Sequence, residues 1–240
     1  MGVASVQAKV QLLLAPRDGA AWDGALAAEL EHLAGAVPGD VDLRLLLRVP
    51  DDPSPHLAAR VEGLGLDSPL YDAVLEVESA TVALAVLVDS VAGAVSRLSD
   101  VVDPARSAAI AGSELVVVAG EGPFEFVYPM RHKAGMTTDE FHTYWMQDHL
   151  EVSRRNGNVG RLRFRQFHGH PPATRAAAEG AGLAIDDLDG AAIGFYDDPE
   201  VFRRVAVDTS FTMHDEANFI DQTRSTMGLY AVHRPRPVAT

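Results

Sequence analysis

Aromatic and imidazole side chains are crowded into one short stretch of this chain, between Phe124 and Arg155. Phe141, Trp145 and His149 recur there at intervals of four residues, which places them on one face of a helix. An aliphatic residue would be enough to end such an apolar stripe. A histidine instead brings a group that titrates near neutral pH, so the stretch is a candidate for proton-transfer chemistry.

His149 is the first candidate for a general acid or base, because it closes this stripe. The alternative is a helix-end histidine that bonds a carbonyl or Asp148. Tyr144 lies about 100° around the helix from Trp145, and its hydroxyl could donate to an oxyanion or simply reach solvent. Phe141 and Trp145 could stack on a substrate, but aromatic residues at helical spacing more often fill a helix–sheet interface.

Two predicted strands carry further candidates. In the first strand, every second side chain lies on the same face, and this face is largely aromatic. It could line an apolar pocket or belong to a barrel core. That face comprises Phe124, Phe126, Tyr128, Met130 and His132. In the second strand Phe164, His168 and His170 share a face, and a His-x-His pair can chelate a metal. The sequence fixes no third ligand, so structural or proton-shuttling roles are preferred and no metal is predicted.

Aromatic and acidic residues gather again near the C-terminus. Phe211 and Phe219 flank His214, Asp215 and Glu216. The acids could cap or orient Arg224 or a histidine, and a carboxylate that fixes a histidine tautomer is a recognised catalytic arrangement. Ordinary surface charge is the alternative.

Composition excludes several classes of function. The chain has 240 residues, no cysteine and a formal charge of −14, so thiolate chemistry is excluded and nucleic acid is not expected as a partner. No serine nucleophile elbow, Rossmann fingerprint, phosphate-binding loop or His-Glu-x-x-His motif is present. The N-terminus resembles a first strand more than a signal peptide, and the apolar tract 80–95 is too short to cross a bilayer. A cytoplasmic protein without membrane contact is expected.

The elements that position the candidates follow one order twice. Hydrophobic periodicity predicts strand, helix, strand, strand, helix, strand in each half, with 120–123 as the joint. The expected ranges are 8–14, 21–35, 41–49, 71–77, 80–98 and 114–119, then 124–132, 137–155, 161–170, 191–196, a helical region from 198 and 225–233. A Pro/Ala/Gly loop is expected after 170. Such a four-stranded sheet leaves one face bare, so we expect two ferredoxin-like βαββαβ repeats, 1–120 and 121–240, to close an α+β barrel as an intrachain pseudo-dimer.

The two halves differ in chemistry. Of sixteen aromatic residues only Trp22 and Tyr71 precede Gly120, and of nine histidines only His32 and His56 do. The first half is therefore expected to be scaffold and the second to hold the site.

Two blocks of the second half resemble the EthD family. The run from Arg131 to His149, RHKAGMTTDEFHTYWMQDH, is similar to that family's basic strand end, Gly-Met/Leu turn and E-F-x-x-Y/W-W-x-x-x-H helix. Asp189-Gly190 resembles its D-G strand start, and DEANFID from Asp215 resembles its D-E-x-x-F-I/V-D helix end. The first half lacks the W-x-x-x-H signature, so it would be a degenerate copy.

The resemblance implies a dimeric α+β barrel, a superfamily that includes monooxygenases, isomerases, polyketide cyclases, dehydratases and haem-dependent peroxidases. Because fold does not decide the reaction, we expect from the residues a cofactor-free lyase or isomerase that dehydrates, cyclises or isomerises a small hydrophobic oxygenated cyclic or polyketide-like substrate. His149 would be the base, with Tyr128, His132, Tyr144 or His168 directed at the substrate oxygen. The expected substrate-binding residues are Phe126, Tyr128, Met130, Phe141, Trp145, Phe164, Phe211 and Phe219.

Other readings of the sequence remain open. One is a cofactor-free monooxygenase with Trp145 beside the substrate. Another is a haem protein with His149 or His168 as axial ligand, and a third is a non-catalytic small-molecule-binding protein. A homodimer of fused pseudo-dimers is also compatible with the pattern.

Overall fold

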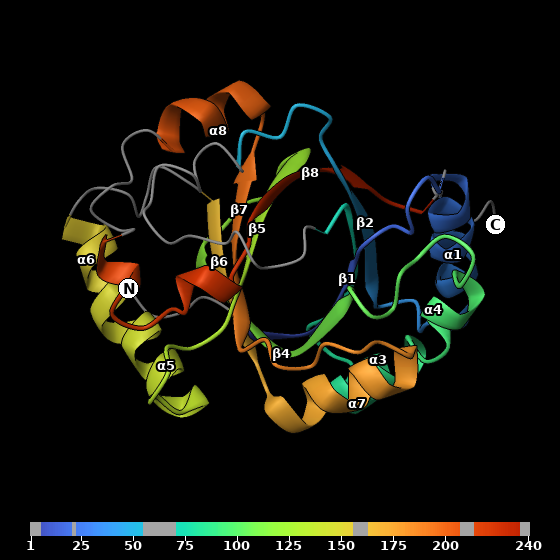
Figure 1. Cartoon of the computed structure of the whole chain (residues 1–240), viewed down its shortest axis with the longest axis horizontal. Coiled ribbons are helices and arrows are strands. Elements are labelled where there is room, and N and C mark those ends of the chain that lie inside the picture. Colours follow the sequence, from blue (N-terminus) through green and yellow to red (C-terminus); the bar gives the residue numbers. More distant parts are fainter. Residues whose placement is uncertain (1–5, 21–22, 55–70, 156–162, 207–213, 236–240) are drawn as a thin grey trace.

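The computed structural model describes residues 6–20, 23–54, 71–155, 163–206 and 214–235. The strands are β1 (Val6–Leu14), β2 (Asp42–Arg48), β3 (Ala73–Ser79), β4 (Ala108–Val118), β5 (Phe124–Met130), β6 (Arg163–Gly169), β7 (Gly190–Tyr196) and β8 (Gly228–His233). They form a closed antiparallel barrel in the order β1-β3-β2-β8-β5-β7-β6-β4 (Figure 1). The predicted α+β class with a closed barrel is confirmed.

Helices cover the outside of this barrel. They are α1 (Asp23–Ala36), α3 (Leu84–Ser90), α4 (Ala94–Arg97), α5 (Thr138–Tyr144), the π-helical turn η1 (Trp145–His149), α6 (Leu150–Arg155), α7 (Pro171–Ala181), α8 (Pro199–Ala206) and the 3₁₀ turn η2 (Gln222–Arg224). In Figure 1, α5 and α6 lie on one side and α1, α3, α4 and α7 on the other. Among the described residues no helix combines the length and apolar character that a bilayer crossing requires.

Each half of the sequence supplies four consecutive positions in the ring. The first half gives β4-β1-β3-β2 and the second gives β8-β5-β7-β6, and the pairs β2–β8 and β4–β6 join them. The interpretation of these halves as duplicated repeats stays a prediction.

Strand alternation separates two cores. On β1, Val10, Leu12 and Leu14 face outward and pack beneath the helices, whereas Leu13 faces into the barrel. The barrel interior has an apolar layer followed by a charged layer. The apolar layer includes Leu13, Leu46, Val74, Ile110, Val127, Phe167, Ile193, Phe195 and Tyr230. The charged layer holds Lys9, Gln11, Arg44, Glu76, Glu78, Glu114, Glu125 and Arg165, all buried.

The expected loop after residue 170 is wrong, because residues 171–181 form helix α7. Pro171 and Pro172 occupy its first positions, where a missing backbone N–H costs nothing. Thr174, Ala177 and Ala181 are buried at helical spacing. The Pro/Ala/Gly composition suggested a loop, but here it marks a helix start and a closely packed small-residue face. This face packs against β4 and α3, within the core of the first half.

The single helix expected over 80–98 is also wrong. It is divided into α3 and α4, and Gly93 between them adopts a φ of 72°. That left-handed conformation is open to glycine at little cost. Gly93 N–H donates to the carbonyl of Gly180, which ties this break to the end of α7.

Candidate active site beneath the α5–α6 helix

The helix that carries His149 begins as its sequence predicts. Thr137 Oγ1 accepts a bond from the backbone N–H of Glu140, and the Glu140 carboxylate accepts from the backbone of Thr137, completing a capping box. The helix then widens into the π turn η1, which starts at Trp145 and ends at His149. Single π turns inside α-helices occur frequently at functional sites.

His149 lies in a hydrogen-bonded group with Asp215. The Nδ1–Oδ2 distance between them is 2.8 Å. The other carboxylate oxygen accepts from the Tyr144 hydroxyl at 3.0 Å and from the Asn218 amide at 3.2 Å. His149 is only 8% exposed. The carboxylate therefore connects a nearly buried imidazole to two further donors.

The environment keeps His149 neutral. Burial lowers its pKa, and the bond to Asp215 opposes this only in part. Because an ionised carboxylate can only accept, Nδ1 carries the proton and Nε2 is left with a free lone pair. Burial and Asp215 raise the pKa of Tyr144, which keeps its hydroxyl as a donor. This arrangement suits a general base with a fixed tautomer.

A short backbone bridge places Asp215 opposite the helix. His132 pairs with Ile220 as an isolated antiparallel bridge beyond the end of β5. Lys133 N–H donates to the Phe219 carbonyl, and Asp221 N–H donates to the Arg131 carbonyl. The end of β5 thereby holds the 214–221 segment against α5 and η1.

Phe219 is the centre of an aromatic cluster at this junction. Its ring lies 5.0 Å from His149, 5.1 Å from Tyr144 and 5.5 Å from Phe141, measured between centroids. The buried members of the cluster are Tyr128, Met130, Phe141, Trp145, Phe219, Ile220 and Met227. Most of the predicted substrate-binding residues are thus packed against one another.

Of the remaining predicted binding residues, Phe126 packs against the edge of this cluster. Phe126 and Phe164 are half-buried, and Phe126 contacts Phe202 at 5.1 Å. Phe211 lies outside the described residues.

His132 belongs to a second polar group, centred on Asp189. Its Nδ1 and its backbone N–H both bond Asp189 Oδ2 at 2.8 Å, and Thr138 Oγ1 donates to Oδ1 at 2.7 Å. His142 Nε2 donates to the Asp189 carbonyl at 2.8 Å. This group fixes the start of α5 to the start of β7. His132 therefore serves a different carboxylate from the one that holds His149.

His168 lies between two rings. It stacks on Trp145 at 4.9 Å and on His142 at 4.4 Å, and its Nε2 donates to Gln166 Oε1 at 3.1 Å. Burial, with nearby His142 and His170, lowers its pKa to about 3. His168 therefore stays neutral near pH 7 and packs the sheet beneath the helix.

The His-x-His pair does not converge on one point. His170 is exposed and bonds Ser113 Oγ at 3.3 Å, whereas His168 bonds Gln166.

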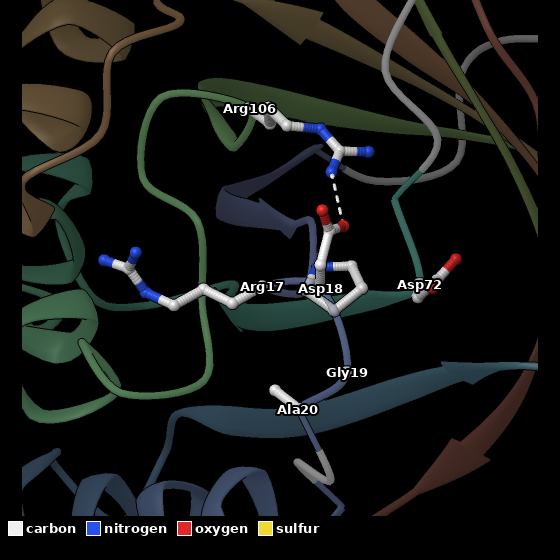
Figure 2. Close-up of a pocket in the computed structure, with 7 residues that line it drawn as sticks. Arg17, Asp18, Gly19, Ala20, Asp72 and Arg106 are labelled. Atoms are coloured by element: carbon white, nitrogen blue, oxygen red, sulfur yellow. Dashed lines mark ion pairs between the residues drawn. The ribbon is translucent and has the colours of Figure 1, made fainter.

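Two clefts among the described residues lie away from these groups. One, of about 340 Å³, is lined by Pro16, Arg17, Asp18, Gly19, Ala20, Asp72 and Arg106 (Figure 2). The other, of about 560 Å³, is lined by Leu47, Arg48, Val49, Pro50, Asp72, Phe124, Ala231 and His233. None of the predicted catalytic residues lines either cleft.

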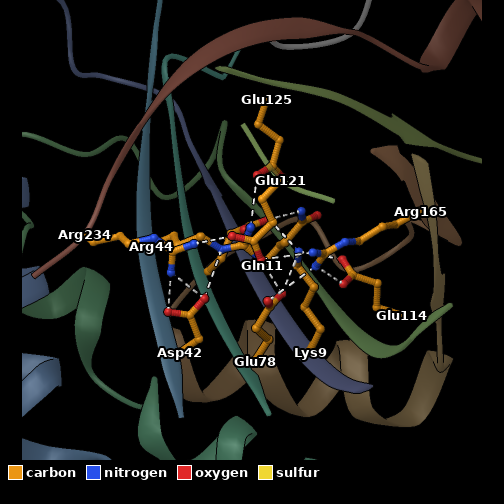
Figure 3. A network of polar contacts seen from close by, with 11 residues as sticks. Lys9, Gln11, Asp42, Arg44, Glu78, Glu114, Glu121, Glu125, Arg165 and Arg234 are labelled. Atoms are coloured by element: carbon orange, nitrogen blue, oxygen red, sulfur yellow. Dashed lines mark hydrogen bonds and ion pairs between the residues drawn. The ribbon is translucent and has the colours of Figure 1, made fainter. Parts of the chain in front are cut away.

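A carboxylate group with metal-ligand spacing lies at the charged layer of the barrel. It consists of Asp42, Glu78 and Glu121. Each of the three already pairs with an arginine: Asp42 and Glu121 with Arg234, and Glu78 with Arg44 (Figure 3). The group is explained by these ion pairs.

Sequence reasoning identified some of these partners and missed others. It named Asp215 among acids that could orient a histidine, without fixing which one. It gave Asn218 no role, although Asn218 lies inside the same DEANFID block. Asp189 was named only as part of the Asp-Gly strand start. The motif blocks themselves were the available signal, because their acids meet the histidines of the helix.

Comparison with known proteins agrees with these blocks. Residues 133–223 match the model of the EthD domain family. The match lies wholly within the second half of the chain. The matched region begins just after His132 and includes the helix with His149, the Asp189 strand start and the Asp215 segment. No curated protein matches the chain.

Several solved structures align with most of the chain. A variant of chlorite dismutase from Candidatus Nitrospira defluvii aligns with a TM-score of 0.51 at 14% identity, covering 94% of this chain and 91% of that one. The imidazole complex of the same enzyme gives 0.48 at 15% identity, with 94% and 91% covered. A protein from Lactobacillus acidophilus assigned as a monooxygenase gives 0.47 at 9%, with 95% and 94% covered. The first of these similarities supports the barrel fold. Sequence identities this low give no information about activity.

Proposed function

We propose that this chain is an enzyme that transfers protons without a bound cofactor, a lyase or isomerase acting on a small hydrophobic, oxygenated cyclic substrate. The observation that carries the proposal is the bond from the buried His149 to Asp215, which Tyr144 and Asn218 also contact.

The chemistry follows from the free lone pair on Nε2. His149 removes a proton from carbon next to a carbonyl; the C–H electron pair forms the C=C bond of an enolate, and the C=O π pair moves onto the oxygen. Asp215 stabilises the imidazolium that forms. The proton then returns to another carbon as the carbonyl re-forms, giving isomerisation. Alternatively it goes to a β-hydroxyl, which leaves as water when the carbonyl re-forms and the enolate C=C pair shifts to break the C–O bond, giving dehydration. The aromatic cluster around Phe219 supports a ring-shaped apolar substrate.

The proposal is tested with 1-tetralone, an aromatic ring ketone, in D₂O. We expect the protein to catalyse exchange of the α-protons, followed by NMR or mass spectrometry. His149→Ala should lower the rate about 10²- to 10⁴-fold, the range of general base catalysis. Asp148→Asn changes the exposed acid beside it and serves as control. Full exchange by a folded His149→Ala protein would exclude this mechanism, and binding without exchange by the wild type would favour a non-catalytic binding protein.

The haem alternative does not fit the residues present. A flat macrocycle needs an open slot beside its axial imidazole. The ring of His149 instead contacts Phe219, and that of His168 is stacked between Trp145 and His142. The second alternative is a cofactor-free oxygenation beside Trp145, which is buried in the same aromatic cluster. A visible spectrum and an oxygen-uptake measurement test both alternatives.

We also infer that the chain is a fused pseudo-dimer, with 1–120 as scaffold and 121–240 as the catalytic repeat. The matching strand orders of the two halves support this inference. So does the absence of the W-x-x-x-H signature from the first half. Sedimentation would show whether two such chains associate further.

A further inference from the structure

Two buried polar groups near the His149 site have no hydrogen-bond partner among the described residues. They are the Tyr128 hydroxyl and the Oε2 atom of Glu216. Such atoms are rare in native proteins, because burying a polar group without a partner costs about 1–3 kcal/mol. Their presence beside a candidate catalytic group calls for an explanation.

Both groups are firmly placed. Tyr128 lies on the outer face of β5 and is 3% exposed, within the aromatic cluster around Phe219. Glu216 directly follows Asp215, the partner of His149. Its carbonyl accepts bonds from the backbone N–H groups of Phe219 at 3.1 Å and Ile220 at 2.8 Å. A loosely held backbone therefore does not explain why these two polar atoms lack a hydrogen-bond partner.

The charge of Glu216 influences Tyr128 without a hydrogen bond between them. Burial raises the pKa of Tyr128 well above its usual value, and the negative charge of Glu216 raises it further. Burial and Asp215 raise the pKa of Glu216 to about 8. Near neutral pH both groups consequently keep their protons and can donate.

We propose that Tyr128 and Glu216 form the oxygen-binding end of the substrate site, where both donate hydrogen bonds to the carbonyl or phenolic oxygen of the substrate. This inference rests on the proposed function, because it assigns the oxygen partner to the proton that His149 removes. In this assignment Tyr128 and Glu216 take the oxygen-directed role expected from the sequence for His132 and His168. Those two histidines bond other partners in the structure.

The chemistry requires no further reactant. When His149 takes the carbon-bound proton, negative charge develops on the substrate oxygen. Two preorganised donors in an apolar site stabilise that charge more strongly than water would. A carboxylic acid kept neutral by its surroundings can serve as such a donor. Glu216 and Tyr128 are therefore catalytic residues in this assignment, since both contact the reacting oxygen.

Binding of 1-tetralone, separate from its exchange, tests the assignment. Affinity is measured by quenching of tryptophan fluorescence in the wild type and in Tyr128→Phe, Glu216→Gln and His149→Ala. We expect Tyr128→Phe to weaken binding about tenfold, the equivalent of one buried hydrogen bond. Tyr196→Phe, a buried tyrosine on neighbouring β7 outside the cluster, should bind as the wild type does.

Glu216→Gln gives an independent readout. Wild-type affinity should fall above about pH 8 as the carboxyl loses its proton, and the amide variant should lose this fall because it does not titrate. Unchanged affinity in Tyr128→Phe, an unchanged pH dependence in Glu216→Gln, or no binding by the wild type would each overturn the proposal.

The same variants separate the two proposals. His149→Ala should keep its affinity for the ketone while losing exchange. If His149→Ala still catalyses exchange but Tyr128→Phe binds weakly, the proposed base is wrong and the oxygen site stands. If exchange depends on His149 while Tyr128→Phe and Glu216→Gln bind normally, the oxygen site is wrong and the base stands.

Discussion

At the scale of single residues, Asp215 determines what His149 can do. The imidazole is buried enough that its pKa falls, and Asp215 is the group that opposes this fall. It also selects the tautomer, because it accepts from Nδ1 and leaves Nε2 free. A histidine at this position without the carboxylate would be a weaker and less well oriented base.

Asp215→Asn should therefore slow exchange and change its pH profile. The acidic limb reports the pKa of His149. That limb should move to lower pH, since the carboxylate that raised the pKa is gone. The rate on the plateau should fall about 10²- to 10⁴-fold. Tyr144→Phe, which keeps the carboxylate, should lose less and keep the limb in place; equal profiles for all three proteins would contradict the role of Asp215.

At the scale of elements, the helix from Thr138 to Arg155 was the best-predicted part of the site. Its start was predicted from Thr137 and the acids that follow, and the capping box confirms it. The π turn could not be predicted, since spacings of four residues are equally compatible with a straight α-helix. The bond from His149 to Asp215 spans 66 positions, a contact that only the folded chain specifies.

The capping box should matter for stability. Thr137→Ala removes the side-chain acceptor for the Glu140 N–H and should lower the free energy of unfolding by about 1 kcal/mol. Thr143→Ala, at an exposed position inside the helix, should change it by less than about 0.5 kcal/mol. Urea unfolding measures both, and equal losses would show that the cap contributes nothing.

Elsewhere, composition and local pattern explain which elements were predicted correctly and which were missed. Alternating residues identified β1, β2, β5 and β7 closely because their two faces differ in environment. Helix α7 was missed because its buried face is alanine, which carries little hydrophobic signal. Strand β4 was predicted only from Glu114 and begins at Ala108, for the same reason.

At the scale of the whole molecule, the charged layer inside the barrel joins the two halves. Arg165 bonds Glu114 at 2.7 Å, and Arg44 bonds Glu125 at 3.3 Å, each pair crossing between halves (Figure 3). Three cations face four carboxylates in this layer. Burial and the neighbouring Glu76 raise the pKa of Glu125 well above its usual value. A protonated Glu125 leaves three charges of each sign.

Glu125→Gln and Glu114→Gln should differ in stability. Glutamine resembles the protonated acid, so the first change should alter the free energy of unfolding near pH 7 only slightly. The second removes the partner that Lys9 and Arg165 share at 2.7 Å and should cost about 3–5 kcal/mol. Urea unfolding distinguishes them, and a larger loss for Glu125→Gln would show that Glu125 is ionised.

The dependence of stability on pH gives a second test of Glu125. Above its ordinary pKa of 4.5 the unfolded chain releases a proton that the folded chain retains. The free energy contributed by this group is therefore complete below that value and declines as pH rises. Glu125→Gln should lose that decline as the pH rises above 4.5. Glu216, with its pKa of about 8, contributes a decline of the same sign, so the variant is compared with the wild type over the same range.

The charged layer also restricts how copies of this chain can assemble. Within the layer the first half brings Lys9 and Arg44 against Glu76, Glu78 and Glu114, and the second half brings Arg165 with Glu125. Two first halves brought together would bury two surplus acids in total, at a high desolvation cost. Neutrality is reached when unlike halves meet in the observed register. The charge pattern inside the barrel therefore favours pairing of unlike halves and disfavours pairing of like halves while the chain folds.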